Sequence, residues 1–344
     1  MHDHTGFQER IDEVLVRLAD EEEQALLGLN TELSPLSEQL RRSLAHGKRI
    51  RAAFLYWGWR AAGQPDCEGV IRAAAAMELV HAAACTHDDI IDDSPMRHGQ
   101  LTAHAAFASA GRRSTALAMI LGDLLMGYAG HVFTTCGLPG AYLARTVPLW
   151  STLLRETMAG EFLEVLRTDA GPNREPHVAE SLEVCRYKTA KYTVERPLHL
   201  GATLGGGSRA LLDVFSAYGL PLGEAFQLRD DLLGTFGDPA RTGKSNLDDL
   251  RDGKPTALLA LTVAAADPDD RRLLAKLVGN PELGAEEAES VRQLMERCGA
   301  KQGVEDMIRE RIARATGALV TVPMPAEARS ALHELAGAAA DRSV

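Results

Sequence analysis

The sequence predicts an all-α protein, and three observations favour that class. Apolar residues recur at three- and four-residue steps along most of the chain, and no stretch stands out with the period-two alternation of a strand. Aromatic residues make up only 5% of the 344 residues, whereas sandwiches and barrels are rich in aromatic and β-branched residues. Hydrophobic residues make up 45% and charged residues 25%, so the chain has enough apolar material for a folded core.

The expected helices follow one another along the chain and are separated by glycine and proline. The apolar face of the first helix is formed by Phe7, Ile11, Val14, Leu15 and Leu18. Similar stripes recur at residues 48–63, 68–92, 113–135, 141–167, 178–203, 207–233, 254–266 and 300–317. Two acidic clusters, at residues 88–93 and 230–231, lie far apart in the chain. They can serve one site only if both halves of the chain belong to one domain. We therefore predict a single all-α domain spanning residues 1–344.

Charge, cysteine content and hydropathy exclude several classes of protein. The net charge of −11 argues against a sequence-independent nucleic-acid binder, which needs a positive field. The five cysteines are odd in number and form no C-x-x-C pair, so they indicate thiols in a reducing compartment. The first residues lack the profile of a signal peptide, and the longer apolar stretches are interrupted by Glu78 or Asp123. We expect a cytoplasmic protein with no stable membrane insertion.

Four aspartates crowd the end of the helix expected at residues 68–92. Asp88 and Asp92 are one turn apart, as are Asp89 and Asp93, and the proline at position 95 should end the helix. Each acid in a last helical turn is unfavourable by about 0.3–1 kcal/mol, because the helix dipole is negative there. A hard cation such as Mg²⁺ would reverse this effect, since it prefers oxygen ligands. A solvated acidic helix end is the alternative for this cluster taken alone.

A second acidic pair, Asp230 and Asp231, lies at the end of the helix expected at residues 207–233. It is followed by acids and lysines, among them Lys244 and Lys254, in a segment broken by glycine and proline. Lysine acts toward phosphate as a point charge, and glycine lets the backbone approach a ligand. This pattern suits a metal-bound polyphosphate.

A basic group, Lys48, Arg49 and Arg51, follows a helix that should end near Ala45. These side chains could meet phosphate oxygens, with arginine using its bidentate fork. A solvated helix start is the alternative for this group by itself. The sequence contains neither a P-loop nor a G-x-S-x-G elbow, so P-loop chemistry and serine hydrolysis are not indicated.

Taken together, these segments resemble the trans-isoprenyl diphosphate synthases, the family that makes farnesyl, geranylgeranyl and longer polyprenyl diphosphates. Residues 47–51 look like its isopentenyl-diphosphate segment, and residues 87–93, with Arg97 and Gly99, look like its first aspartate-rich motif. Lys188-Thr189 and residues 226–231 look like later motifs. The match runs in order from about residue 40 to 260, and residues 261–344 would be C-terminal helices of the same domain. Segments 56–60 and 191–197 look most like the actinobacterial geranylgeranyl-type branch.

The resemblance implies a single large helical bundle of the isoprenoid synthase type around a central apolar cavity. It implies an enzyme of isoprenoid biosynthesis, a transferase that condenses isopentenyl diphosphate with dimethylallyl, geranyl or farnesyl diphosphate by ionisation, condensation and elimination. About two to three Mg²⁺ ions would assist, with Mn²⁺ as a substitute. The resemblance also implies a homodimer, in which residues 113–135 would bury exposed Ala and Leu across a two-fold axis.

The resemblance also implies roles for individual residues. The implied catalytic residues are Asp88, Asp92, Arg97, Lys188, Thr189, Gln227 and Asp230. The implied metal ligands are Asp88, Asp89, Asp92, Asp230 and Asp231. The implied substrate-binding residues are Lys48, Arg49, Arg51, His81, Arg97, His98, Lys188, Thr189, Gln227, Lys244 and Lys254.

Five positions depart from the family pattern. His98 stands where the family has a second arginine, and a histidine is shorter and only partly charged near neutral pH. We therefore expect weaker binding of isopentenyl diphosphate. Gly234 replaces the third aspartate of the second motif, a pattern shared with the actinobacterial branch and not interpreted as inactivating. Glu161 stands where glutamine is usual, and His46 and Ala52 flank the basic group in place of glycine and proline.

Product length depends on the residues that the growing prenyl tail would meet. Ala83, Ala84 and Cys85 are small and lie about one turn before Asp88, whereas in the family a bulky aromatic there stops growth at farnesyl diphosphate. A deeper tyrosine, Tyr128, could close the shaft. We therefore predict geranylgeranyl diphosphate as the main product. The alternative is that the alanines are merely small residues at a helix-packing contact.

Other functions are left open. Within the family, the product could be farnesyl or a longer polyprenyl diphosphate. A class I terpene cyclase shares the first acidic motif, but Gly234 and Asp238 fall where its second motif needs other residues. An HD-type phosphohydrolase could use His87-Asp88, although no upstream histidine set completes it. A weakly catalytic partner subunit of a prenyl synthase is suggested by His98 and Gly234.

Overall fold

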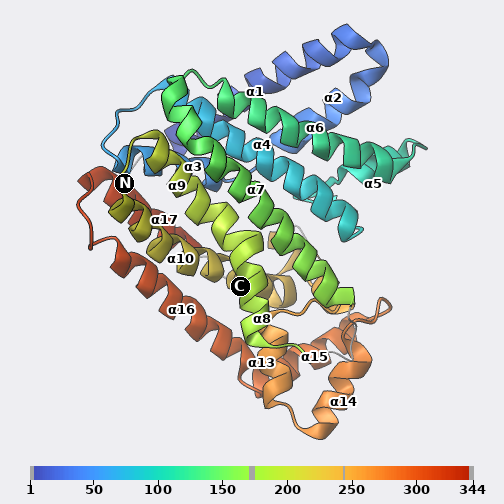
Figure 1. Cartoon of the computed structure of the whole chain (residues 1–344). Coiled ribbons are helices and arrows are strands. Elements are labelled where there is room, and N and C mark those ends of the chain that lie inside the picture. The colour runs from blue at the N-terminus through green and yellow to red at the C-terminus, as the bar shows by residue number, and fades with distance from the viewer. Residues whose placement is uncertain (1–3, 170–174, 243–244, 341–344) are drawn as a thin grey trace. The chain divides into compact units, whose positions relative to one another are not determined.

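The computed structural model describes residues 4–169, 175–242 and 245–340, and most of these lie in helices (Figure 1). This confirms the predicted all-α class. The helices are α1 His4–Leu29, η1 Thr31–Leu33, α2 Ser34–Leu44, α3 Ile50–Ala61, α4 Glu68–Ile91, α5 Ala103–Ser109, α6 Ser114–Thr134, α7 Gly140–Asp169, α8 Val178–Val184, η2 Cys185–Glu195, α9 Arg196–Leu204, α10 Arg209–Phe236, α11 Pro239–Thr242, α12 Asp248–Arg251, α13 Ala257–Ala265, α14 Pro268–Leu277, α15 Ala285–Arg297, α16 Ala300–Ala318 and α17 Ala326–Ala340. The strands are β1 Met96–Arg97 and β2 Gln100–Leu101.

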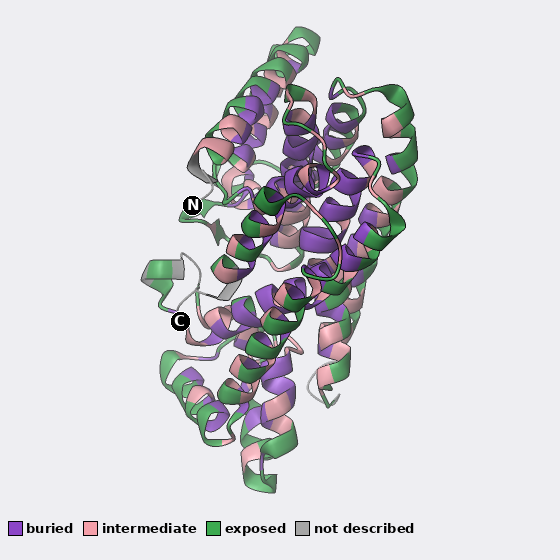
Figure 2. Ribbon diagram, turned by 90° about the vertical axis from the view of Figure 1, so that its left-hand side faces the viewer, coloured by how far each residue is buried: buried purple, intermediate pink, exposed green. Residues whose placement is uncertain are grey.

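The helices group into two compact units. The N-terminal unit comprises residues 1–146 and 200–207, and the C-terminal unit comprises residues 147–199 and 208–344. In both, buried residues line the inward helix faces and exposed residues the outward ones (Figure 2). This is the arrangement that three- and four-residue periodicity predicts.

Helix α4 is the core of the N-terminal unit. It packs along α6 and also against α3 and α1, and its alanine run at residues 73–76 is completely buried. A Cβ on Gly69 would lie 2.9 Å from Leu138 just beyond α6, whereas His87 at the other end of α4 contacts Met119 early in α6. The two helices are therefore antiparallel, and small alanine side chains let them approach closely.

Helix α6 is long and apolar enough, by length and composition, to cross a membrane. A buried core helix passes the same test, and residues such as Leu121, Leu125 and Val132 are completely buried within the N-terminal unit. This packing accounts for one face of α6, whereas Met119 and Ile120 on the same helix are each 52% exposed.

Helix α10 is the corresponding core of the C-terminal unit, where it packs against α16 and η2. Leu228 and Leu232 on α10 belong to one buried cluster with Leu258, Val291 and Ile308. The helix continues to Phe236, beyond the end predicted at residue 233, so the second acidic pair lies inside its last two turns.

Two local features were not predicted from periodicity. The stripe at residues 178–203 is divided into α8, η2 and α9, and η2 is a π-helix, a form often found at functional sites. A short antiparallel hairpin pairs Met96 with Leu101 and Arg97 with Gln100. The hairpin and the π-helix both carry residues of the predicted site.

Candidate active site

The hairpin after α4 turns the chain back toward the acidic end of that helix. His98 and Gly99 form its two-residue turn, with φ angles of 50° and 74°. Positive φ at both turn residues is the geometry that matches the twist of a tight hairpin. Histidine is among the few residues besides glycine that tolerate it. This turn places Arg97 beside the aspartates of α4.

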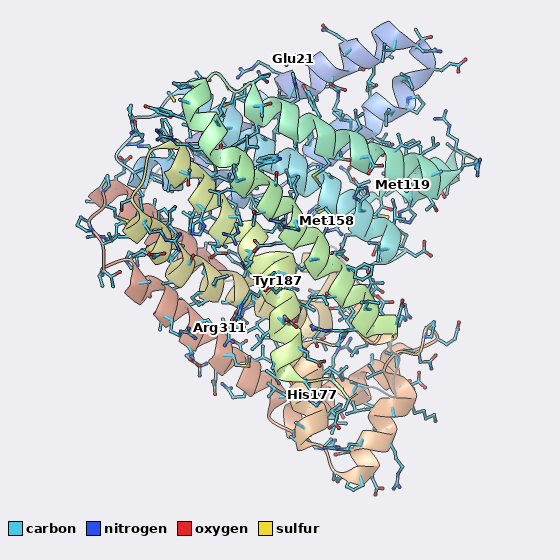
Figure 3. All side chains as sticks on the ribbon, viewed as in Figure 1. Glu21, Met119, Met158, His177, Tyr187 and Arg311 are labelled. Atoms are coloured by element: carbon cyan, nitrogen blue, oxygen red, sulfur yellow. The ribbon has the colours of Figure 1, made fainter. Side chains whose placement is uncertain are left out.

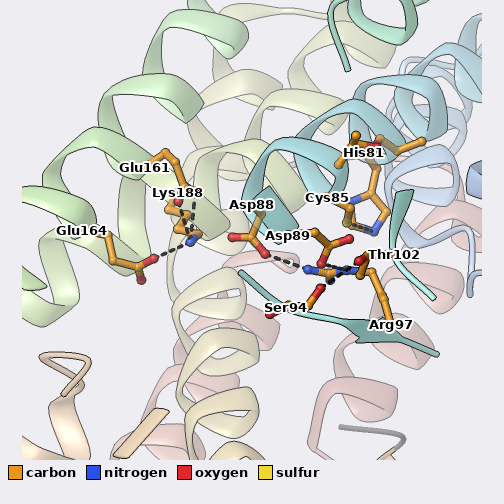
Figure 4. Close-up of polar contacts among 12 residues, drawn as sticks. His81, Cys85, Asp88, Asp89, Ser94, Arg97, Thr102, Glu161, Glu164 and Lys188 are labelled. Atoms are coloured by element: carbon orange, nitrogen blue, oxygen red, sulfur yellow. Dashed lines mark hydrogen bonds and ion pairs between the residues drawn. The ribbon is translucent and has the colours of Figure 1, made fainter. Parts of the chain in front are cut away.

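Arg97 forms ion pairs with two of the four aspartates (Figure 4). Its Nε donates to Asp89 Oδ1 and its Nη2 to Asp88 Oδ2, each at 2.7 Å. Burial by itself would lower the pKa of Arg97, but Cys85, Asp89 and Asp88 outweigh this effect and raise it. Arg97 thus offsets part of the repulsion at the end of α4, where Asp92 caps the helix.

The N-terminal unit gathers positive charge next to these aspartates. Burial lowers the pKa of His81 well below its usual value, and the charges of Arg51, Arg97 and His98 lower it further. His81 is therefore neutral near pH 7, and one of its ring nitrogens lies 3.5 Å from Cys85 Sγ. Two arginines, Arg51 and Arg97, and the His98 imidazole therefore lie close to the neutral ring of His81.

Arg49 differs from its basic neighbours. Its side chain is only 4% exposed, whereas Lys48 is exposed. The Arg49 guanidinium donates to Asp12 Oδ1 and to the Leu44 carbonyl, each at 2.6 Å, and to the His46 carbonyl at 3.0 Å. The structure thus commits Arg49 to holding the loop against α1 and the end of α2.

In the C-terminal unit, a small cavity collects the predicted residues of η2 and α10. Its volume is about 30 Å³, and Lys188, Thr189, Gln227, Asp231 and Lys254 all contribute to its lining. The Thr189 hydroxyl donates to Gln227 Oε1 at 2.6 Å, and Gln227 Nε2 donates to Asp231 Oδ1 at 2.8 Å. This chain of hydrogen bonds fixes the orientation of the Gln227 amide. Lys244 lies outside the described residues.

The carboxylates of this cavity are too crowded to ionise independently. Burial, together with the charges of Asp249, Glu164 and Asp230, raises the pKa of Asp231 to about 8, and the hydrogen bond from Gln227 opposes this shift. A divalent cation would relieve this crowding, and oxygen ligands are those that Mg²⁺ prefers. The donor set of the second acidic cluster therefore fits Mg²⁺.

Across the described part of the chain, no group of three or more His, Cys, Asp or Glu side chains is placed to hold a metal ion. This agrees with the coordination habits of Mg²⁺, which is usually bound by one or two carboxylates together with water and phosphate oxygens. Both clusters therefore carry oxygen donors of the kind found in partial Mg²⁺ sites.

Lys188 is enclosed by two glutamates of α7 (Figure 4). Its Nζ lies 3.0 Å from Glu161 Oε2 and also pairs with Glu164. The close approach of η2 to α7 depends on Gly160, where a Cβ would lie 2.3 Å from the Lys188 backbone nitrogen. The two carboxylates therefore offset the positive charge of Lys188.

Volume alone does not identify the site. A larger cavity of about 350 Å³ in the C-terminal unit is lined by apolar residues of α13 and α14 together with Arg167, His177 and Arg271. None of the predicted site residues lines it. The smaller cavity is the better candidate because its residues carry the chemistry.

The residues expected to set product length lie in different surroundings. Ala83 is completely buried and lies one turn before His87, which contacts α6, whereas Ala84 is partly exposed and lies one turn before Asp88. Tyr128 is buried and its hydroxyl donates to the Leu18 carbonyl on α1 at 2.9 Å. Ala84 therefore shares the face of the first acidic cluster, while Tyr128 is held toward α1.

Glu164 and Asp249 were missed in the sequence as members of this region. The only signal for Glu164 was its position three residues after Glu161, on the same face of a helix. Asp249 was one of several acids in the segment after the second cluster, and nothing distinguished it from Asp248.

Comparison with known proteins agrees with this chemistry. Residues 34–297 match the family model of polyprenyl synthetases. The chain is 32% identical to the (2E,6E)-farnesyl diphosphate synthase of Mycobacterium tuberculosis over 301 residues, covering 86% of this chain and 80% of that protein. It is 29% identical to the octaprenyl diphosphate synthase of Escherichia coli over 281 residues, covering 80% of each.

A solved structure of similar fold is the geranylgeranyl pyrophosphate synthase of Corynebacterium glutamicum, complexed with isoprenyl diphosphate and magnesium. It matches with a TM-score of 0.91 and 34% identity, covering 98% of this chain and 99% of that one. The helices therefore adopt the isoprenoid synthase fold. The chain belongs to the polyprenyl synthetase family of trans-prenyltransferases.

Proposed function

We propose that this protein condenses isopentenyl diphosphate with an allylic diphosphate and that its main product is geranylgeranyl diphosphate. The observation that carries the proposal is the shared cavity of Lys188, Thr189, Gln227, Asp231 and Lys254, which joins cations, acids and neutral oxygens. The test is incubation of the purified protein with isopentenyl diphosphate, MgCl₂ and each allylic primer in turn, followed by chromatography of the products. A weakly catalytic partner subunit would form no prenyl product alone.

We propose that Asp88, Asp89 and Asp92 in one unit, and Asp230 and Asp231 in the other, hold the Mg²⁺ ions. Bound Mg²⁺ would neutralise the charge that develops on the leaving diphosphate. About two to three Mg²⁺ ions would be bound, and Mn²⁺ would be able to replace them. The crowded carboxylates around Asp231 support this proposal.

The basic residues divide between the two substrates. Arg97, Lys188, Lys244 and Lys254 would bind the allylic diphosphate, and their charges would stabilise the diphosphate as it leaves. The isopentenyl diphosphate would lie against Lys48, Arg51, His81 and His98. Arg49 would position this group rather than bind substrate directly, because its guanidinium is engaged by Asp12 and by backbone carbonyls.

Thr189 and Gln227 would face the allylic cation. Neither side chain is a strong nucleophile, and their mutual hydrogen bond fixes the oxygens in place. An environment of fixed dipoles that excludes water protects such a cation from hydrolysis. The proton lost at the end of the reaction would pass to the departing diphosphate.

Geranylgeranyl diphosphate is proposed as the product for two reasons. The small Ala84 leaves room one turn before Asp88, where a bulky residue would stop growth earlier. The Corynebacterium glutamicum protein of similar fold is a geranylgeranyl pyrophosphate synthase. Relatives that make farnesyl and octaprenyl diphosphates define the alternative products.

We also propose that the chain acts in the cytoplasm as a single domain spanning residues 1–344. Helices α7 and α9 each run without a break through a boundary between the two units. Such continuity favours cooperative folding of the whole chain.

His98 takes the place of an arginine at the proposed isopentenyl-diphosphate site. His98→Arg should lower the KM for isopentenyl diphosphate about 5- to 20-fold, because a permanent, bidentate charge replaces an imidazole that is only partly charged near neutral pH. The KM for the allylic primer should be unchanged. Arg49, with a φ of 53°, shows that arginine fits this backbone conformation in the same chain.

His98→Asn is the matched control, because asparagine tolerates the same turn but carries no charge. Steady-state kinetics at fixed MgCl₂ measure both constants for each variant. Equal isopentenyl-diphosphate KM values in wild type, His98→Arg and His98→Asn would show that His98 does not contact this substrate.

We propose that the protein forms a homodimer through exposed apolar residues of α7. Met158, which is labelled in Figure 3, is followed at four-residue spacing along α7 by Phe162 and Leu166, and Phe162 is 65% exposed. Phe162→Glu should convert the dimer to a monomer at micromolar concentration, because a charge would be buried in an apolar contact. Sedimentation velocity measures this. Leu273→Glu on α14 is the control, and a wild-type monomer would refute the proposal.

A further inference from the structure

We propose that Asp249, from the short helix α12, supplies the carboxylate that position 234 lacks in the second acidic cluster. Asp249 would then act with Asp230 and Asp231 toward the metal-bound diphosphate. The inference rests on the proposed function. Because no three His, Cys, Asp or Glu side chains of the described residues are placed to hold an ion by themselves, Asp249 would act together with the water and diphosphate ligands of the ion.

The first observation is the contact between Gly234 and Asp249. A Cβ built on Gly234 would lie 2.1 Å from Oδ2 of Asp249 and 3.2 Å from its Cγ. Real Cβ atoms essentially never approach a neighbour within 3.0 Å. The Asp249 carboxylate therefore occupies the space in which any side chain at position 234 would begin.

The second observation is where this space lies on α10. Gly234 is four residues after Asp230 and three after Asp231, so it lies on the same face of the helix, one turn further along. A carboxylate against Gly234 is consequently a neighbour of both acids. Glycine at position 234 thus makes room for an acid that comes from elsewhere in the chain.

The third observation is that α12 is anchored. Leu250, the residue after Asp249, is 3% exposed and belongs to the same buried cluster as Leu228 and Leu232 of α10. The carbonyl of Leu250 accepts a hydrogen bond from the Gly279 backbone at 2.8 Å. Core packing therefore holds Asp249 against α10.

The fourth observation is the surrounding charge. Asp249, Asp230 and Glu164 are the negative charges that act on Asp231, whereas the ammonium group of Lys254 lies 3.8 Å from Asp249 Oδ1. Oδ2 faces Gly234 and Oδ1 faces the lysine. A role limited to anchoring Lys254 is the competing explanation, and it predicts no effect on metal binding.

The first experiment measures metal binding directly. Mn²⁺ is titrated into the full-length protein with inorganic pyrophosphate, and free Mn²⁺ is followed by electron paramagnetic resonance. Asp249→Asn should weaken Mn²⁺ binding about 10-fold or more, as is usual when a group that supports a metal site is removed. Asp248→Asn, which removes the same charge one residue earlier, should leave it unchanged. Equal binding by wild type and Asp249→Asn would overturn the proposal.

The second experiment uses the contact with Gly234. Gly234→Ala introduces a Cβ that displaces the carboxylate, so it should weaken Mn²⁺ binding as much as Asp249→Asn. The double variant should be no weaker than either single one. Alanine is a better helix former than glycine, so a loss of binding with a maintained or raised Tm could not be attributed to unfolding. Full Mn²⁺ binding by Gly234→Ala would contradict the proposal.

The third experiment relocates the carboxylate. Gly234→Asp combined with Asp249→Ala should recover most of the Mn²⁺ binding that Asp249→Ala alone loses, because the acid then comes from α10. Binding as weak as in Asp249→Ala would count against the inference. Product formation by the wild-type protein tests the proposed function separately. A wild type that makes prenyl product while Asp249→Asn binds Mn²⁺ normally would refute only the role of Asp249.

Discussion

Asp92→Asn is expected to lower turnover by about 10²–10³-fold or more while leaving the fold intact. The loss is expected because the carboxylate at the end of α4 would no longer help to hold the cation that offsets charge on the leaving diphosphate. Without Mg²⁺, the variant should be slightly more stable than wild type, by about 0.3–1 kcal/mol, since an acid is removed from a helix C-terminus. Prenyl-product formation and thermal unfolding in EDTA measure the two effects.

Asp92 is a cleaner position than Asp88 for this test. Asp88 also pairs with Arg97, so its removal would disturb a second group of the site. Asp93→Asn is the matched control, because that side chain is 98% exposed and asparagine tolerates its φ of 48°. Near-normal turnover of Asp92→Asn would remove the first acidic cluster from the mechanism.

Ala84→Phe is expected to shift the main product from geranylgeranyl to farnesyl diphosphate with little loss of total condensation. Ala84 is partly exposed and shares a helix face with Asp88, so an aromatic ring there would meet the growing prenyl tail. Chromatography of the dephosphorylated products measures the chain-length distribution. An unchanged distribution would mean that the tail does not pass this residue.

Ala83→Phe is the control within the same helix. Ala83 is completely buried on the face of α4 that packs against α6, so overpacking should destabilise the protein by about 1–3 kcal/mol. The sequence predicted the same role for both alanines, and the structure distinguishes them. If Tyr128 closes the shaft, Tyr128→Ala should lengthen the product. Because the Tyr128 hydroxyl donates to the Leu18 carbonyl, the same variant should also weaken the packing of α1.

Some features of the protein follow from the sequence alone. The helix predicted at residues 68–92 is observed at Glu68–Ile91, because its periodicity and the following proline are local signals. The helix expected to end near Ala45 does end at Leu44. The ordered acidic and basic motifs indicated the family, which the comparisons confirm. All these inferences depend on residues that are neighbours in the chain.

Other features were decided by the tertiary structure. A basic motif does not reveal that Arg49 is buried against Asp12 while Lys48 is exposed, since this depends on how α1 packs. The sequence also does not reveal that the π-helix that carries Lys188 approaches α7 closely at Gly160. Periodicity reports which face of a helix is apolar, but it does not report which other segment covers that face.

Gly234 shows most directly the difference between what the sequence reveals and what the tertiary structure decides. In the sequence, Gly234 stands where the family motif has an aspartate, and its neighbours in the chain give no reason for this replacement. In the structure its missing Cβ is the space taken by the Asp249 carboxylate, which α12 brings back to α10 through the burial of Leu250. The sequence determined the helices and the chemical groups they carry. Packing of distant segments decided which of these groups meet, because such contacts depend on the whole core rather than on local spacing.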